Sequence, residues 1–179
     1  MIKTIRVILG DQLNPFHSWF TEVKTDVSYL FIESRGEASY APHHIQKVVG
    51  IFSSMRQFAN TLKRQGHKVI YHKILKSREF ELIDILDSVC VKIGVHNLQF
   101  QYPDELRMLQ NLQKLKTRDY RISFTSSEHF ISTPEDFRET FAGKKTFLME
   151  SFYRKLRKKT GILMQGNQPK GIEAWKTRA

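Results

Sequence analysis

A chain of 179 residues is long enough to bury the core of one domain, and its composition, 40% hydrophobic and 26% charged, is typical of a globular rather than a disordered protein. The chain has no apolar run near the ~20 residues that span a bilayer and no signal-peptide pattern at its N-terminus, so we expect a cytoplasmic protein without membrane contact. A single cysteine, Cys90, excludes both an internal disulfide and a metal cluster held by cysteines of this chain, and we expect it to be inert packing in a helix.

Short apolar runs alternate with helical patterns along the chain. The predicted strands are residues 5–9, 27–32, 69–71, 97–102 and 120–124. The clearest helix is predicted over residues 43–65, where apolar residues recur every three or four positions, with Pro42 at its first position and Gly66 just past its end.

Four further helix signals follow. A helical pattern from Phe80 ends at Gly94, and a second helix opens at residues 103–105 with leucines at 106, 109, 112 and 115 on one side. Thr133 and Pro134 are typical of a helix start, and a last helix is predicted over residues 147–160, closed by Gly161.

This alternation predicts an α/β fold, a Rossmann-like five-stranded parallel sheet with helices on both faces. The first strand should be central, because an all-apolar strand needs cover on both sides. We expect one domain over residues 1–164 and an irregular tail over residues 165–179, where the periodicity fades around an isolated tryptophan, Trp175.

Two acidic, glycine-bearing loops follow the first two predicted strands. The first is Gly10-Asp11-Gln12-Leu13, and the second runs from Glu33 to Tyr40. In a parallel sheet such loops lie at the carboxyl ends of the strands, where ligands bind. We therefore expect the two loops to converge on one functional crevice.

Simpler roles remain open for these residues. Asp11 could cap a turn, Glu37 could be a solvated loop carboxylate, and Tyr40 could close the top of the core. Glu33 could be a surface residue at the end of its strand. The pair His43-His44 is a poor metal site, because adjacent helical side chains point ~100° apart and no further ligand follows at suitable spacing.

Five motifs, in this order, resemble one family. They are Leu9-Gly10-Asp11-Gln12-Leu13, Glu37-Ala38-Ser39-Tyr40 with His43-His44, Ile51-Phe52-Ser53-Ser54-Met55-Arg56, Met149-Glu150-Ser151-Phe152-Tyr153-Arg154 and Lys159-Thr160-Gly161-Ile162-Leu163-Met164. Together they are similar to the photolyase-related branch of the cryptochrome/photolyase family, which includes the bacterial iron–sulfur (6-4) photolyases. The resemblance covers the N-terminal α/β domain of those longer proteins.

The resemblance implies a light-harvesting role for this domain. In the family such a domain holds an antenna chromophore, usually 6,7-dimethyl-8-ribityllumazine, while a separate helical domain binds FAD, an iron–sulfur cluster and damaged DNA. The candidate chromophore-binding residues are Gly10, Asp11, Gln12, Glu37, Tyr40 and His44. We expect neither FAD nor an iron–sulfur cluster on this chain alone, since the residues that would hold them are missing.

The net charge of +11 indicates affinity for a polyanion or an acidic partner. Basic residues gather in the last predicted helix, and the nucleic-acid candidates are Arg154, Lys155, Arg157, Lys158 and Lys159. A charged, solvated face around Leu148, Phe152 and Leu156 explains them equally well.

Three functions are therefore kept. The first is a truncated or stand-alone antenna domain of a photolyase-related protein, not catalytic alone. The second is a basic module that binds nucleic acid or an acidic partner. The third is one half of a split light-driven DNA repair enzyme that joins a separately encoded flavin domain.

Overall fold

The computed structural model describes residues 1–74, 81–165 and 168–169. Its contacts divide the chain into two compact units, Met1–His129 and Phe130–Ala179, a division that was not predicted from the sequence. Most of the predicted irregular tail, Trp175 included, lies outside the described residues, as does Phe80, the start of the helical pattern that ends at Gly94. No described helix has the length and apolar character needed to cross a bilayer.

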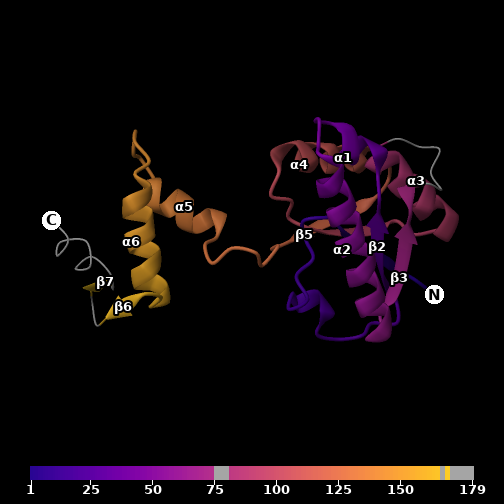
Figure 1. Cartoon of the computed structure of the whole chain (residues 1–179), viewed down its shortest axis with the longest axis horizontal. Coiled ribbons are helices and arrows are strands. Elements are labelled where there is room, and N and C mark those ends of the chain that lie inside the picture. The colour runs from indigo at the N-terminus through magenta and orange to yellow at the C-terminus, as the bar shows by residue number, and fades with distance from the viewer. Residues whose placement is uncertain (75–80, 166–167, 170–179) are drawn as a thin grey trace. The chain divides into compact units, whose positions relative to one another are not determined.

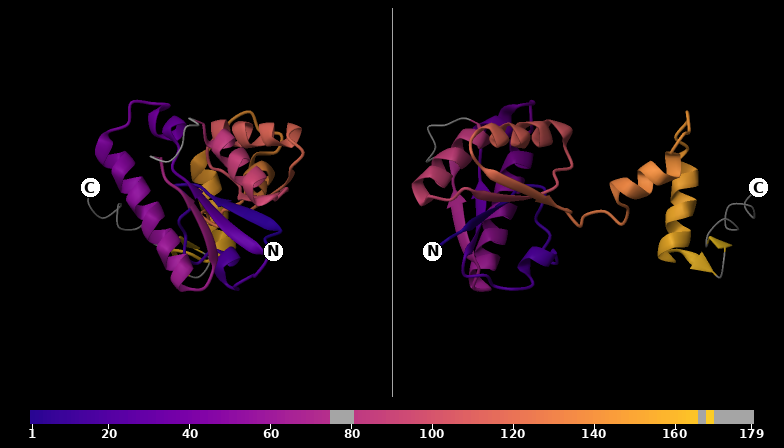
Figure 2. Two further views of the ribbon diagram at one scale, coloured as in Figure 1. Left: turned by 90° about the vertical axis from the view of Figure 1, so that its right-hand side faces the viewer. Right: turned by 180° about the vertical axis from the view of Figure 1, so that it is seen from behind.

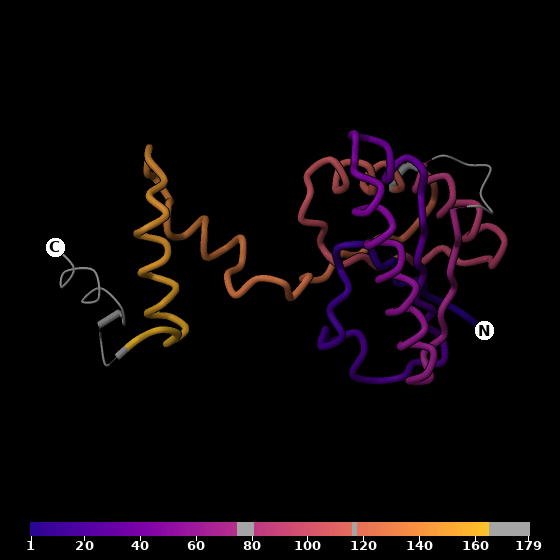
Figure 3. The backbone as a smooth tube through the Cα atoms, viewed as in Figure 1, coloured from indigo at the N-terminus to yellow at the C-terminus, as the bar shows by residue number. Residues whose placement is uncertain are grey.

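The first unit is built on a five-stranded parallel sheet in the order β3-β2-β1-β4-β5 (Figure 1). Its strands are β1 (Thr4–Ile8), β2 (Val27–Ile32), β3 (Lys68–His72), β4 (Asn97–Gln101) and β5 (Arg121–Thr125). The chain runs outward from β1 to β3 and then returns to β4 on the other side of β1 (Figure 3). The predicted α/β class, the five parallel strands and the central first strand are confirmed.

Helices cover both faces of this sheet (Figure 2). The helix α2 (Ile45–Arg64) packs on the face that receives Ile8, whereas α3 (Leu82–Ile93) and α4 (Leu106–Gln113) pack on the face that receives Ile5 and Val7. The described residues of the unit also include the short helical segments η1 (Ser18–Phe20), α1 (Arg35–Ser39) and η3 (Lys114–Thr117). Side chains from α3 and α4, among them the buried Cys90, fill the second face, and burial raises the pKa of the Cys90 thiol to about 12.

Local details correct three expectations. Residues 35–39 form a short helix rather than a loop, because the Ser34 side chain accepts from the amide of Glu37 and caps it. The helix α2 begins at Ile45, not at Pro42, since His44 is its N-cap. The buried residues of α4 are Met108 and Leu112, while Leu106 is 67% exposed in the first turn.

The second unit contains α5 (Pro134–Phe141), α6 (Met149–Thr160) and a short antiparallel pair, β6 (Met164–Gln165) with β7 (Gln168–Pro169). Both predicted helix signals are confirmed. Thr133 and Asp136 form a reciprocal capping box at the start of α5, and Gly161 ends α6 in the left-handed region with a φ of 71°. The rings of Phe137, Phe141, Phe147 and Phe152 pack together between the two helices.

Glu33 is a buried anchor rather than a surface residue. Its side chain is 0% exposed, and its carboxylate accepts two hydrogen bonds from Arg56 of α2, at 2.6 and 2.8 Å. The Tyr71 hydroxyl of β3 donates at 2.7 Å and the Ile74 amide at 3.2 Å. Burial alone would raise the pKa of Glu33, but these hydrogen bonds outweigh burial and lower the pKa below 4.5. The contact ties α2 to the ends of β2 and β3.

Replacing Arg56 by Leu should destabilise the first unit, because Glu33 would keep a buried charge with only two neutral donors. We expect a loss of about 2 kcal/mol at pH 7, less than the ~3–5 kcal/mol typical of a fully buried pair, since Arg56 is partly solvated. Because the pKa of Glu33 is lower in the folded than in the unfolded state, its charge stabilises the fold at pH values above the unfolded pKa. This stabilisation is lost as the pH falls through the folded pKa. The difference between variant and wild type should therefore narrow towards pH 4.

Urea unfolding at pH 7 and pH 4 measures both effects. The matched control is Arg64→Leu on the same helix, where the guanidinium donates to the Thr61 hydroxyl and to no other described side chain. That variant should stay within about 0.5 kcal/mol of the wild type. An Arg56→Leu variant as stable as the control at pH 7 would contradict the anchor.

Candidate functional site

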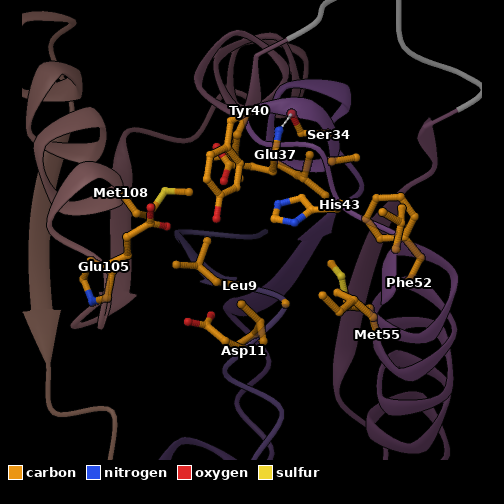
Figure 4. A pocket seen from close by; sticks show the side chains of 18 of the residues that line it. Leu9, Asp11, Ser34, Glu37, Tyr40, His43, Phe52, Met55, Glu105 and Met108 are labelled. Carbon is orange, nitrogen blue, oxygen red and sulfur yellow. Dashed lines mark hydrogen bonds between the residues drawn. The ribbon is translucent and has the colours of Figure 1, made fainter. Parts of the chain in front are cut away.

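A pocket of about 300 Å³ lies at the carboxyl ends of the strands in the first unit (Figure 4). The strands β2 and β4 lie on opposite sides of β1, so the connections that follow them lead away from the end of β1 in opposite directions. Such a switch point leaves a crevice at the carboxyl ends of the strands. The pocket is lined by residues of all three connections and by one side of α2. The predicted convergence of the first two loops is present, and the connection from β4 to α4 joins them.

Most of the pocket wall is apolar. In Figure 4, Phe52 and Met55 of α2 lie on one side and Met108 of α4 on the other, with Leu9 between them. Gly10 allows α2 to approach the end of β1, because a Cβ at that position would lie 2.9 Å from the Cγ2 atom of Ile51. Gly10 therefore shapes the pocket without offering a side chain to a ligand.

Asp11 places a carboxylate at the mouth of this apolar pocket, close to Glu105 and Asp104. Burial by the surrounding protein raises the pKa of Asp11, and repulsion from Asp104 and Glu105 adds to the rise. Its own backbone amide and His129 oppose the rise in part. Among the hydrogen bonds of the described residues, none satisfies the Asp11 side chain from another side chain, so it is available to accept from a ligand.

Glu37 also lines the pocket, but its charge is already paired. The Arg107 guanidinium donates to both carboxylate oxygens of Glu37, at 3.0 and 2.7 Å. The same guanidinium donates to both oxygens of Glu105, at 2.9 and 3.1 Å. Hydrogen bonds to Glu37 first, and then to Glu105, raise the pKa of Arg107 further. The sequence analysis missed Arg107, since no local pattern relates residue 107 to residue 37.

Tyr40 lies at the rim of the pocket, with 52% of its surface exposed. Its ring is covered on one side by the Arg107 guanidinium, 4.0 Å from the ring centroid, and meets the His43 ring edge to face at 4.9 Å between centroids. Tyr40 is therefore not a plug of the core. It is a partly exposed aromatic wall beside the opening.

Two predicted site residues do not line the pocket. The side chain of Gln12 is buried, accepts from the Leu9 amide and donates to the Gln101 carbonyl oxygen, so it braces the loop from behind. His44 caps α2 by accepting from the Gln46 amide at 3.2 Å. The neighbouring His43 lines the pocket instead, together with Lys47, whose Nζ lies 3.4 Å from the Nδ1 atom of His43. No group of His, Cys, Asp or Glu in the described part of the chain could hold a metal ion.

The model of the deoxyribodipyrimidine photo-lyase-related protein family matches residues 6–175, nearly the whole chain. The chain belongs to this family. It is also 34% identical over 177 residues to a protein named (6-4) photolyase from Agrobacterium fabrum (strain C58 / ATCC 33970), in an alignment that covers 92% of this chain. The chain spans about a third, 33%, of the length of that relative.

The basic candidates of this photolyase-related chain all lie on α6 of the second unit. Three of them already have partners: Arg154 pairs with Glu150 at 2.8 Å, Lys159 with Asp136, and Arg157 donates to the Leu163 carbonyl oxygen. Lys155 and Lys158 are exposed one turn apart on the same helix. Of the apolar stripe expected beneath them, Phe152 is buried, whereas Leu148 is exposed.

Replacing Asp11 by Asn should stabilise the folded photolyase-related domain at neutral pH. A raised carboxyl pKa means that the folded state disfavours the charged form of Asp11. The wild type therefore has its full stability at pH values below the unfolded pKa of Asp11, and loses part of it as the pH rises through the folded pKa. The neutral variant avoids that loss. We expect a rise in Tm of about 1–2 °C at pH 7, kept small by solvent screening, and no rise near pH 3.

Thermal unfolding at the two pH values measures this difference, with Asp84→Asn as a control. Asp84 is an exposed carboxylate that pairs with Arg118 at 3.2 Å away from the pocket, so its replacement should not raise Tm. A lower Tm for Asp11→Asn at pH 7 would show that the Asp11 charge is favourable in the fold, contrary to this account.

Proposed function

We propose that this chain is an antenna-type domain whose pocket binds a planar, donor-bearing chromophore of the ribityl-lumazine class. The observation that carries the proposal is the Asp11 carboxylate, held at the mouth of an apolar pocket where the sheet order reverses. Asp11 is exposed to solvent at this mouth, and a carboxylate in a cleft that has a raised pKa and no side-chain hydrogen bond among the described residues is a candidate for a functional site. Membership of the photolyase-related family, whose members bind chromophores, supports the same function.

The residues of the pocket fit 6,7-dimethyl-8-ribityllumazine in kind and in size. A volume of about 300 Å³ lies at the lower end of the range for small-molecule sites. The apolar side chains of Phe52, Met55 and Met108 suit the faces of a flat heterocycle. Carboxylate oxygens accept from ring N–H groups and from ribityl hydroxyls, and the Tyr40 ring can cover the heterocycle at the rim.

Asp11 and Glu37 have different tasks in this proposal. Asp11 provides the acceptor that selects a ligand with an N–H or O–H donor, since the side chain has no competing donor among the described side chains. Glu37 is bound by Arg107 on both oxygens and offers only its remaining lone pairs. Lys47 and His43, at the α2 side of the pocket, can donate to the ring carbonyl groups.

The domain supplies binding and orientation, whereas the absorbed light energy would pass to a flavin held elsewhere. The matched region is about a third, 33%, of the (6-4) photolyase relative, so the repair activity of that relative is not carried over to this chain. Whether the chain acts as a stand-alone or truncated domain, or as one half of a split repair enzyme with a separately encoded flavin domain, therefore stays a prediction. Recovery of light-driven repair after mixing with such a domain would decide for the split enzyme.

Titration of ligand-free protein with 6,7-dimethyl-8-ribityllumazine, followed by fluorescence anisotropy, tests the proposal. The wild type should bind, and Asp11→Ala should bind about tenfold to a hundredfold more weakly, because a buried ligand donor loses its acceptor at ~1–3 kcal/mol. Glu37→Gln should weaken binding less than Asp11→Ala does, because one amide oxygen can still accept a hydrogen bond. The matched control Asp84→Ala removes a carboxylate outside the pocket and should leave affinity unchanged. Equal affinity for wild type and Asp11→Ala would remove Asp11 from the site, and no binding by the wild type would reject the chromophore proposal.

A second candidate function is binding of nucleic-acid phosphates by α6. The helix carries five cations against one acid, Glu150, within twelve residues, and Lys155 and Lys158 are exposed on neighbouring turns. Contacts of this kind are indifferent to base sequence and weaken steeply with salt. The ion pairs of Arg154 and Lys159 limit how many cations are available, so we expect a small number of phosphate contacts.

Reversing both charges in Lys155→Glu/Lys158→Glu should weaken binding to duplex DNA and reduce the log–log salt slope by about 1.8, or ~0.9 per lost phosphate contact. The control Lys63→Glu/Lys92→Glu changes the net charge equally on α2 and α3 of the first unit. Electrophoretic mobility assays at several salt concentrations provide both values. If the two double variants weaken binding equally, the effect comes from net charge and α6 is not the contact surface.

A further inference from the structure

Arg107 lies outside the pocket lining but touches three residues of the pocket wall. It stands in the first turn of α4, after β4, while Glu37 and Tyr40 belong to α1 and its C-cap, after β2. In the sheet order, β1 lies between β2 and β4, and the loop after β1 carries Gly10 and Asp11. Arg107 therefore links the two connections that flank the end of the central strand.

The contacts of Arg107 are unusually complete for a side chain that is 33% exposed. Its four hydrogen bonds to Glu37 and Glu105 use all but one of the N–H groups of a guanidinium. The face of the same group lies on the Tyr40 ring. A planar fork that is bidentate to two carboxylates and stacked on an aromatic ring fixes the direction of all three partners.

Glu37 and Tyr40 need such a support. Glu37 is the central residue of the five-residue helix α1 and Tyr40 is its C-cap, and a helix of this length is too short to be stable by itself. The hydrogen bonds of that helix include the Ala38 amide to the Ser34 carbonyl oxygen at 3.2 Å and the Tyr40 amide to the Gly36 carbonyl oxygen at 3.0 Å. Tertiary contacts must therefore hold α1 in place, and Arg107 contacts two of the pocket-lining residues of this segment, Glu37 and Tyr40.

We propose that Arg107 is the positioning residue of the pocket, which holds Glu37 and Tyr40 in the orientation that receives the ligand and bridges the carboxylates of Glu37 and Glu105, offsetting one of their two negative charges. This inference rests on the proposed ligand-binding function and names the residue that prepares the site. It also explains ligand selection. With two of the three lining carboxylates bound to Arg107, Asp11 is the acceptor left to discriminate between ligands.

Hydrogen exchange of the ligand-free protein tests the positioning role without any ligand. In Arg107→Ala, the amides of Ala38 and Tyr40 should exchange about tenfold faster than in the wild type, while those of β1 stay protected. Arg107→Lys keeps the positive charge but not the planar guanidinium, so the exchange rates of these amides should lie between those of the wild type and Arg107→Ala. Arg118→Ala, which breaks a comparable surface pair with Asp84, is the control and should leave α1 unchanged. Unchanged exchange in Arg107→Ala and Arg107→Lys would overturn the inference.

A double-mutant cycle then separates positioning from general stability. Arg107→Ala should weaken 6,7-dimethyl-8-ribityllumazine binding about tenfold in the wild-type background, but clearly less in a Glu37→Gln background, where there is no charge to orient. Equal losses in both backgrounds would overturn the inference, because Arg107 would then act independently of Glu37. If the wild type does not bind lumazine and Arg107→Ala still speeds exchange in α1, the chromophore proposal fails while the positioning role stands.

Discussion

The burial of β1 on both faces is the constraint on which the rest of the structure depends. Val7 faces α3 and α4 and Ile8 faces α2, so the strand must lie in the middle of the sheet with helices on either side. A central first strand means that the chain leaves it in one direction towards β2 and returns to its other side as β4. The connections then diverge above the end of β1, and this divergence opens the pocket. The site is a consequence of how the core is filled.

The carboxylates near this end of the sheet differ by whether an arginine reaches them. Glu33 is wholly buried and is held by Arg56, and Glu37 is partly buried and is held by Arg107. Arg56 comes from α2, the helix that follows the same strand as Glu33, whereas Arg107 comes from α4, which follows β4 on the other side of β1. Each pair therefore joins two elements of the unit. No arginine among the described residues pairs with Asp11, and the surrounding protein together with Asp104 and Glu105 raises its pKa, the direction expected for a charge that the fold does not favour. A charged side chain that does not stabilise the fold is a candidate for ligand binding.

The parts of the fold that follow from periodicity and from turn chemistry could be predicted from the sequence. The apolar runs placed the five strands, and Gly94, Thr133 and Gly161 marked real helix ends. Errors arose where a side chain acts locally in an unusual way. His44 caps α2 through its ring nitrogen, so the helix starts later than Pro42 suggested, and His43 rather than His44 meets the pocket. The leucine spacing placed Leu112 and Leu115 correctly in the core, but Leu106 is exposed in the first turn of α4 and Met108 also lies on the buried face.

The contacts that organise the site could not be predicted, because they join residues far apart in the sequence. Nothing near residue 107 points to residue 37, and nothing near residue 56 points to residue 33. The sequence did place Gly10, Asp11, Glu37 and Tyr40 at one crevice, where the structure also has them. The sequence could not show that Arg107 forms an ion pair with Glu37 while no described arginine reaches Asp11, since such pairs depend on which helix passes above the end of each strand.

A crystal structure of the chain with 6,7-dimethyl-8-ribityllumazine tests the central claim most directly. The account predicts the heterocycle between α2 and α4, over the end of β1, with a ring N–H or ribityl hydroxyl donating to Asp11 and the Glu37–Arg107 pair intact beside it. A ligand bound elsewhere, or a ligand in the pocket that leaves Asp11 without a contact, would contradict the account.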